Sequence, residues 1–488
     1  MPIQFNTIPI SIEVPGQYVE IDNSRAQQGL AQDPHRILVM GQKLAAGSAA
    51  ADVLVQVTSL AQARDYFGQG SMLAGEFEKL FAARRDIVTW ALPVADDGAG
   101  VQAAGTLTFT GPATAAGTIY LWIAGRPIRV AVLNADTATA IATTAAAAIN
   151  AEKDLAVTAS SAVGVVTVTA RHKGAEGNSI DLRGNYADGE KLPAGVGLAV
   201  VAMASGATNP VLTTALANLG DNWFQTIVFP WLDSTSLSAI EAKLLDRWGG
   251  TKMIEGIAYA VKRETHANLL TFGGARNSAF AVAMGGKNLL TPPWEHAAVL
   301  AVQCAYEAMQ DPARPLQQVS LPGVLPPATA DRFTKDEREL LLKSGVATFV
   351  VDPSGNCLIE RAITTYQKDS QNNPDKSYHD SETIRTLMRL RYTSRTKIAQ
   401  LYPRYKLASD STPVSSGQVI VRPKDIRQTL ISIFDLWQQE GLVENKNQFI
   451  TDLVVERSAS DVNRVDAVIP PDVINQLRVF AAQVQFRL

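Results

Sequence analysis

Two kinds of apolar run alternate in TIVFPW (226–231), LSAIEAKLLDRW (237–248), IEGIAYAV (254–261), HANLLTF (266–272) and SAFAVAM (278–284). The first, third and fifth runs are short and mostly apolar, which is typical of buried strands. The second and fourth carry apolar residues at helical spacing. Strands and helices that alternate in this way predict a mainly parallel sheet.

The same texture occurs nearer the N-terminus. The run 36–41 predicts a buried strand, and Ser59 with Gln62 predicts the start of a helix. Between 96 and 206 the composition changes to Gly, Ala, Thr and Val, with several strand-like runs and one helix at 137–150. We therefore predict an α/β middle domain that is interrupted by an inserted β-rich domain.

A third region begins with the capping box Thr334 to Glu337. It contains a hairpin turn at 352–356, an amphipathic helix at 424–440 and the segment IPPD (469–472), which we expect to open a short helix. The fold class is α/β plus α+β, and the C-terminal α+β domain should hold a sheet of about four strands. The predicted boundaries are an N-terminal arm and linker at 1–34, the middle domain at 35–95 and 207–333, the inserted domain at 96–206, and the C-terminal domain at 334–488.

Both ends of the chain alternate between apolar and polar residues with the period of a half-buried strand. A strand that runs to the last residue needs a sheet that receives it, either in its own fold or in a neighbouring subunit. The two ends therefore predict strand-like arms. The apolar positions are Ile8, Ile10, Ile12 and Val14 at the N-terminus, and Phe480, Ala482, Val484, Phe486 and Leu488 at the C-terminus.

The length of 488 residues indicates several domains. Hydrophobic residues make up 46% of the sequence and charged residues 19%, which is typical of an ordinary globular protein. A net charge of −3 argues against a nucleic-acid-binding surface over the whole molecule. Two cysteines fit a reducing cytosol, and we find no signal peptide and no apolar run long enough to span a membrane.

The sequence contains no group of residues with the spacing of a known catalytic or metal-binding motif. Gly285 to Asn288 has the Gly-Lys pair of a phosphate loop but lacks its first glycine and its Ser/Thr, so a strand-to-loop turn is favoured. The five histidines do not lie at metal-ligand spacing. We therefore expect no enzyme activity, no catalytic residue, no cofactor and no metal.

One charge pattern stands out, because residues 378–410 contain seven basic and three acidic side chains. A solvated helix face is one interpretation, and a basic surface for an acidic partner is the other. Lys424 and Arg427 extend the pattern onto the next helix.

The order of several short tracts resembles the tail sheath proteins of Mu-like contractile-tailed phages, over essentially the full length. The tracts are VPGQY (14–18), ERAITT (360–365), EGLVEN (440–445), VER (455–457), DVNR (461–464), IPPD (469–472), QLR (476–478) and FRL (486–488).

The resemblance implies six-membered rings that stack around a rigid tail tube. It implies that the C-terminal domain faces the tube, that the inserted domain faces outward, and that the arms of one subunit join the sheet of its neighbours. The sheath would be assembled extended and then contract to drive the tube through the host envelope. The subunit-joining residues would be Ile8, Ile10, Ile12, Val14, Phe480, Val484, Phe486 and Leu488, and the tube-facing basic residues Arg385, Arg389, Lys424 and Arg427.

The implied partners are further copies of the chain, the tail tube protein, and the baseplate and tail terminator proteins, without direct nucleic-acid contact or membrane insertion. The implied location is the virion tail, after assembly in the host cytoplasm. Two alternatives remain open: the sheath of a phage-like bacteriocin or secretion particle, and an α/β enzyme with a β-rich lid domain.

Overall fold

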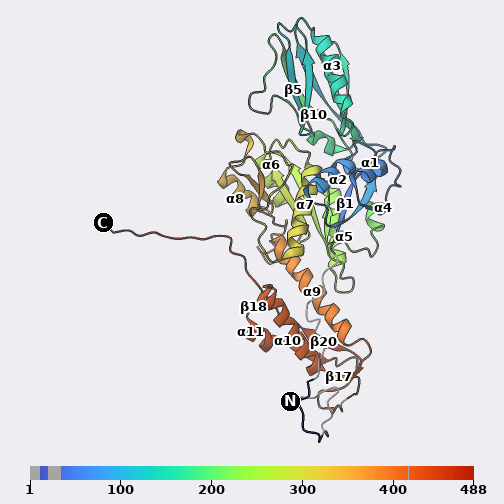
Figure 1. Cartoon of the computed structure of the whole chain (residues 1–488), viewed down its shortest axis with the longest axis vertical. Helices are drawn as coiled ribbons and strands as arrows, with labels where there is room; N and C mark the ends of the chain where they lie inside the picture. Colours follow the sequence, from blue (N-terminus) through green and yellow to red (C-terminus); the bar gives the residue numbers. More distant parts are fainter. Residues whose placement is uncertain (1–10, 12, 20–34, 416, 488) are drawn as a thin grey trace. The chain divides into compact units, whose positions relative to one another are not determined.

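The computed structural model describes residues 11, 13–19, 35–415 and 417–487 (Figure 1). These residues divide into two units. We call them the large unit (35–388 and 475–487) and the C-terminal unit (389–474, with the described residues before 34).

A six-stranded sheet forms the centre of the large unit, and its neighbouring strands are all parallel except β2 and β3. Parallel strands covered on both faces are apolar throughout, and Ile37, Leu38, Val39 and Met40 of β1 are all fully buried. The mainly parallel sheet is thus confirmed. Its order is β13 (Ala281–Gly286), β12 (Ile257–Arg263), β11 (Thr226–Val228), β1 (Arg36–Gln42), β3 (Val88–Val94) and β2 (Val55–Val57).

The helices of this sheet begin at polar caps, because a side-chain oxygen there accepts a hydrogen bond from an otherwise unpaired backbone N–H. Ser59, Ser71, Asp233 and Thr265 all do so. The most buried helix is α7, which packs against α2 and the sheet (Figure 1). The helices are α1 (Leu60–Phe67), α2 (Met72–Ala83), α4 (Thr213–Ala217), α5 (Ser234–Trp248), α6 (His266–Gly274) and α7 (Pro293–Gln310).

Residues 96–206 form two further sheets and one helix around a core of their own, which includes Leu107, Ile119, Val130 and Ile141. One sheet has the order β10-β4-β8-β7 and the other β6-β5-β9. The elements are β4 (Gln102–Thr110), β5 (Gly117–Ile123), β6 (Arg126–Val132), α3 (Ala138–Ala151), β7 (Val157–Ala162), β8 (Val165–Lys173), η1 (Ala175–Ser179), β9 (Leu182–Gly184) and β10 (Gly197–Ala204).

A polar cluster links this inserted region to the central sheet. His172 Nε2 accepts from the backbone N–H of Met72 at 3.0 Å, so His172 Nδ1 carries the proton and donates to Asp96 Oδ1 at 2.8 Å. The same carboxylate accepts from Gln42 Nε2 at 2.7 Å and from the Lys173 N–H at 2.9 Å. Burial acts to raise the pKa of Asp96, but these hydrogen bonds outweigh it and lower that pKa.

The chain remains in the large unit well beyond the predicted boundary at 334. The capping box of α8 is present, but Ala347 bridges Met284 in parallel, and Ile359, Ile363 and Ile384 lie in the central core. This continuous part of the large unit ends at 388, inside α9. The added elements are η2 (Thr329–Asp331), α8 (Lys335–Lys343), β14 (Thr348–Val351), β15 (Cys357–Arg361) and the start of α9 (Ser381–Leu401).

Helix α10 lies at the centre of the C-terminal unit. The apolar face that the sequence predicts for this helix is buried in the core of the unit. Phe434 stacks on Phe449 with ring centroids 4.2 Å apart, and Trp437 Nε1 donates to Thr393 Oγ1 at 2.8 Å. The elements after α9 are β16 (Lys406–Leu407), β17 (Ile420–Val421), α10 (Pro423–Gln439), β18 (Val443–Glu444), α11 (Lys446–Asp452), β19 (Val454–Arg457), β20 (Val465–Val468) and β21 (Asp472–Val473).

Two expectations for this region are wrong. The segment IPPD does not open a helix, because Asp472 and Val473 pair with Glu444 and Val443 as a strand. A proline also favours an extended conformation in the residue before it. The four-stranded sheet is absent from the described residues of this unit, where the strands form three separate pairs instead.

Candidate functional site

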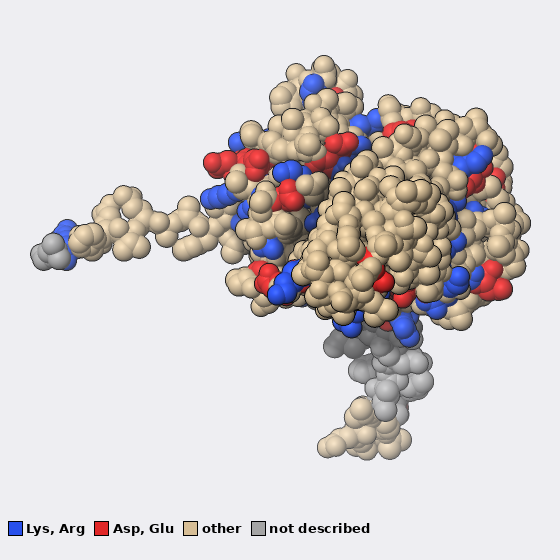
Figure 2. Space-filling view, turned by 90° about the horizontal axis from the view of Figure 1, so that it is seen from above, with Lys and Arg blue, Asp and Glu red and all other residues tan. Residues whose placement is uncertain are grey.

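The last described residues form an exposed apolar arm. Every residue from 479 to 487 is exposed, including Phe480 at 85%, Val484 at 87% and Phe486 at 80%. Residues 475–487 have no strand partner within the described chain. Figure 2 shows this arm as a mostly uncharged segment, while acidic and basic side chains intersperse on the face in view. A mostly uncharged segment with an apolar face and unpaired backbone groups is suited to strand addition.

The remaining predicted joining residues are only partly covered by the structure. Val14 is 68% exposed, and its carbonyl accepts a hydrogen bond from Tyr18 Oη at 3.0 Å. Ile8, Ile10, Ile12 and Leu488 lie outside the described residues.

Arg385 is buried, so it must be removed from the set of predicted tube-facing basic residues. Arg385 is only 5% exposed, and its Nη2 donates to Thr226 Oγ1 at 2.7 Å and to Tyr259 Oη at 3.1 Å. A charge count along a helix cannot show which face meets the sheet, which explains the error. Arg385 anchors α9 to β11 and β12 instead.

The other three basic residues belong to the C-terminal unit and have local partners. Arg389 forms an ion pair with Glu440 at 3.4 Å. Lys424 is exposed and its Nζ donates to the Asp410 carbonyl at 2.6 Å. Arg427 Nη2 donates to the Ile450 carbonyl at 2.5 Å, near the end of α11. Lys424 therefore presents the most accessible charge of the three.

Two buried carboxyl groups, which the sequence analysis missed, lie where α2 packs on α7. Glu76 is fully buried, with no hydrogen-bond partner for either carboxyl oxygen, and Glu295 is 3% exposed. Burial, and next the charge of Glu295, raise the pKa of Glu76 well above its usual range. Burial raises the pKa of Glu295 to about 7. Glu76 is followed by the charged residues Glu78 and Lys79 on the same helix, so no local pattern signals that its carboxyl group is buried.

The phosphate-loop candidate is a turn at the end of β13. Lys287 Nζ forms an ion pair with Asp331 Oδ1 at 2.9 Å, and Asn288 adopts a positive φ of 47°. A Cβ at Gly286 would lie 2.5 Å from the Leu289 side chain, so a larger residue here would require that side chain to move. The strand-to-loop interpretation is confirmed.

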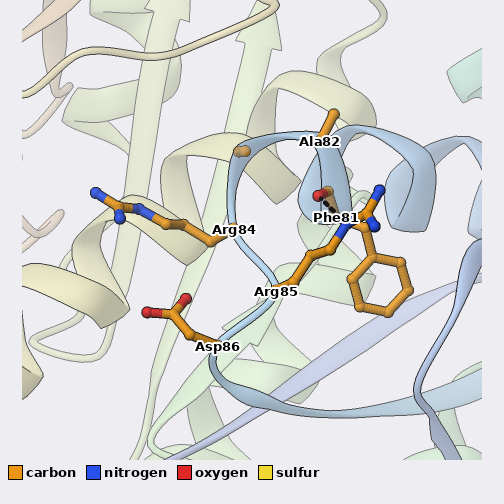
Figure 3. Close-up of a pocket in the computed structure, with 6 residues that line it drawn as sticks. Phe81, Ala82, Arg84, Arg85 and Asp86 are labelled. Carbon is orange, nitrogen blue, oxygen red and sulfur yellow. Dashed lines mark hydrogen bonds between the residues drawn. The ribbon is translucent and has the colours of Figure 1, made fainter.

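The surface pockets of the large unit hold structural contacts. A pocket of about 650 Å³ is lined by residues 81–86, where Arg84 and Asp86 point away from Arg85, whose Nε donates to the Phe81 carbonyl at 3.0 Å (Figure 3). The Arg84 guanidinium lies 3.6 Å from the centre of the Tyr306 ring.

Among the described residues, no group of three or more His, Cys, Asp or Glu side chains is arranged to hold a metal ion. The described helices include none with the length and apolar character that a membrane crossing requires.

Comparison with known proteins gives the family. The central-domain model of phage tail sheath proteins matches residues 205–365, and the C-terminal-domain model matches residues 373–487. The Mu-like prophage FluMu tail sheath protein of Haemophilus influenzae is 40% identical over 489 residues, which covers 100% of both chains.

Solved structures with lower similarity include two sheath proteins. The sheath tail protein Lin1278 of Listeria innocua is 12% identical with a TM-score of 0.49, covering 92% of this chain and 94% of that one. The contracted helical sheath of the anti-feeding prophage is 11% identical with a TM-score of 0.49, covering 97% and 99%. The assignment rests on the full-length identity of 40%. This chain therefore belongs to the phage tail sheath protein family, and it is a structural protein rather than an enzyme.

Proposed function

We propose that the chain is the subunit of a contractile tail sheath, which polymerises as stacked six-membered rings around the tail tube. Family membership supports this proposal, and the exposed apolar arm at 479–487 is the observation that carries it. Contraction drives the tube through the host envelope. The partners are other copies of the chain, the tube, the baseplate and the terminator, and the subunit is incorporated into the virion tail after assembly in the host cytoplasm.

The joint between subunits is made by strand addition. The C-terminal arm pairs with a sheet edge in the C-terminal domain of a neighbour, and the N-terminal arm, with Ile8, Ile10, Ile12 and Val14, does the same. Each main-chain hydrogen bond contributes about 1 kcal/mol net. Each buried Val or Phe adds roughly 1.5–3 kcal/mol before the cost of ordering the arm. One joint is modest, and a mesh of many joints is strong through multivalency.

Contraction requires no cofactor under this proposal. The free energy comes from the difference between two packings of the same folded bodies, while the arms keep the subunits connected. Surfaces of the middle domain that meet only in the contracted state supply this difference.

The test uses a matched pair of double substitutions on the two faces of the arm. Val484→Asp with Phe486→Asp places two charges on the apolar face, and Gln483→Asp with Gln485→Asp places the same charges on the polar face. We expect the first pair to abolish tubules and the second to preserve them, as seen by electron microscopy and sedimentation. Deletion of residues 1–16 should also prevent assembly while the folded units remain intact. Normal tubules from the apolar-face variant would refute strand addition by this arm.

A further inference from the structure

Arg478 marks the point where the C-terminal arm leaves the large unit. Its Nη2 lies 2.9 Å from Asp380 Oδ1 and 3.2 Å from Glu382 Oε1, at the start of α9. The Arg478 side chain is only 16% exposed, whereas every described residue after it is exposed. Two residues earlier, Gln476 Nε2 donates to the Ala313 carbonyl at 3.1 Å.

The carboxylates that hold Arg478 are themselves held in place. Arg361 donates through Nε and Nη2 to both oxygens of Asp380, each at 3.0 Å. Glu382 Oε1 also accepts from the backbone N–H of Leu316 at 3.1 Å, and the Glu382 side chain is 3% exposed. Arg478 therefore meets a preformed acidic site, and charge-assisted hydrogen bonds of this kind are about twice as strong as neutral ones.

These contacts determine which part of the molecule carries the arm. The last backbone pairing before the arm is in the C-terminal unit, where the Ile474 N–H donates to the Leu442 carbonyl at 3.0 Å. Arg478 and its acidic partners all belong to the large unit. With the contact closed, the ten residues after Arg478 reach at most about 35 Å, and opening it adds four residues, or about 13 Å.

We propose that Arg478, Asp380 and Glu382 form a clasp that fixes the C-terminal arm to the large unit. This inference rests on the proposed function, in which the arm joins a neighbouring subunit. The closed clasp shortens the free tether and fixes its exit, which lowers the entropy lost on strand addition. It also means that force on the arm is delivered to the start of α9 and the central sheet, rather than to the C-terminal unit alone.

The first measurement uses the unassembled full chain with a nitroxide on Val479→Cys. Both native cysteines are buried, so the introduced thiol is labelled selectively. We expect Arg478→Gln to increase the mobility of the label and Gln476→Ala to give a smaller increase. Arg464→Gln is the matched control, since Arg464 has a 65% exposed side chain that pairs with Asp466. Thermal melting checks that each variant is folded.

The second measurement is the critical concentration for tubule formation without the label. We expect Arg478→Gln to raise it about tenfold, which corresponds to about 1.4 kcal/mol, and to raise it less in an Asp380→Asn background. Arg464→Gln should leave it unchanged. Unchanged label mobility, or increased mobility with an unchanged critical concentration, would overturn the clasp. The apolar-face variant decides the sheath proposal separately, because it leaves Arg478 and its partners intact.

Discussion

Replacing Glu295 by Gln should make the protein more stable at alkaline pH. Glu295 lies in the first turn of α7, where Gly75 of α2 leaves room for it: a Cβ at Gly75 would lie 2.9 Å from Glu295 Oε1. Lys79 Nζ lies 3.9 Å from Glu295 Oε2. Burial raises the pKa of this carboxyl, and the charges of Lys79 and Arg126 only partly oppose the rise.

The direction of the pH effect follows because the folded chain keeps the Glu295 carboxyl protonated to a higher pH than the unfolded chain does. The pKa of Glu295 rises from 4.5 to about 7 on folding. Its contribution to stability is therefore complete below about pH 4.5 and is lost as the pH rises through about 7. Each pKa unit corresponds to about 1.4 kcal/mol, so ionisation in the folded chain costs about 3 kcal/mol above pH 8. Glutamine is neutral and has a similar volume, so it removes this cost.

The assay is thermal unfolding at pH 5 and pH 8.5. For a cooperative unit as large as the large unit, the entropy of unfolding is about 0.8 kcal/mol/K, so ~3 kcal/mol corresponds to ~4 °C. We expect Glu295→Gln to raise the melting temperature by about this amount at pH 8.5 and to change it little at pH 5. Glu339→Gln, whose side chain is 60% exposed, is the control and should have little effect at either pH. An equal shift at both pH values would refute the reasoning.

Two further substitutions test other parts of the molecule. Asp96→Asn should destabilise the inserted region by about 2 kcal/mol, because an amide cannot accept from both His172 and the Lys173 N–H, and melting against the control Asp97→Asn measures this. Lys424→Glu should lower co-assembly with the tube protein about fivefold while self-assembly is retained. The control Lys343→Glu, at another exposed site, should leave co-assembly unchanged. Equal co-assembly of the two variants would contradict a tube-facing role for Lys424.

Local signals in the sequence predict the elements of the large unit well. The alternation between 226 and 284 predicts the parallel sheet, and the pair Thr334 and Glu337 forms the expected capping box. The sequence gives only weak signals for the strands β7 and β10 of the inserted region. Both are built largely from Ala, Ser, Val and Gly, whose weak contrast gives little periodicity.

The errors occur where long-range packing decides the outcome. The capping box at 334 identifies the start of a helix, but no local pattern shows that Ala347 will bridge Met284 and keep residues 334–388 in the central core. Arg385 belongs to a basic segment whose composition is typical of a solvated helix face. Its position on α9 nevertheless directs its side chain toward Thr226 and Tyr259. Glu76 and Glu295 are also apparent only after α2 meets α7.

The arm exposes its apolar side chains, whereas the rest of the large unit buries them. The central sheet and α7 bury nearly all of their apolar side chains, so folding of the large unit does not depend on the arm. The arm leaves Phe480, Val484 and Phe486 exposed on a segment of nine described residues. A segment this short has few apolar side chains to offset the cost of ordering it against another arm, but a neighbour's sheet edge is already ordered. Arg478 favours the same outcome, since it fixes the exit of the arm before the neighbour arrives. Folding and assembly are thus encoded in different residues of one chain, and substitutions in the arm should change assembly without changing the melting temperature of the large unit.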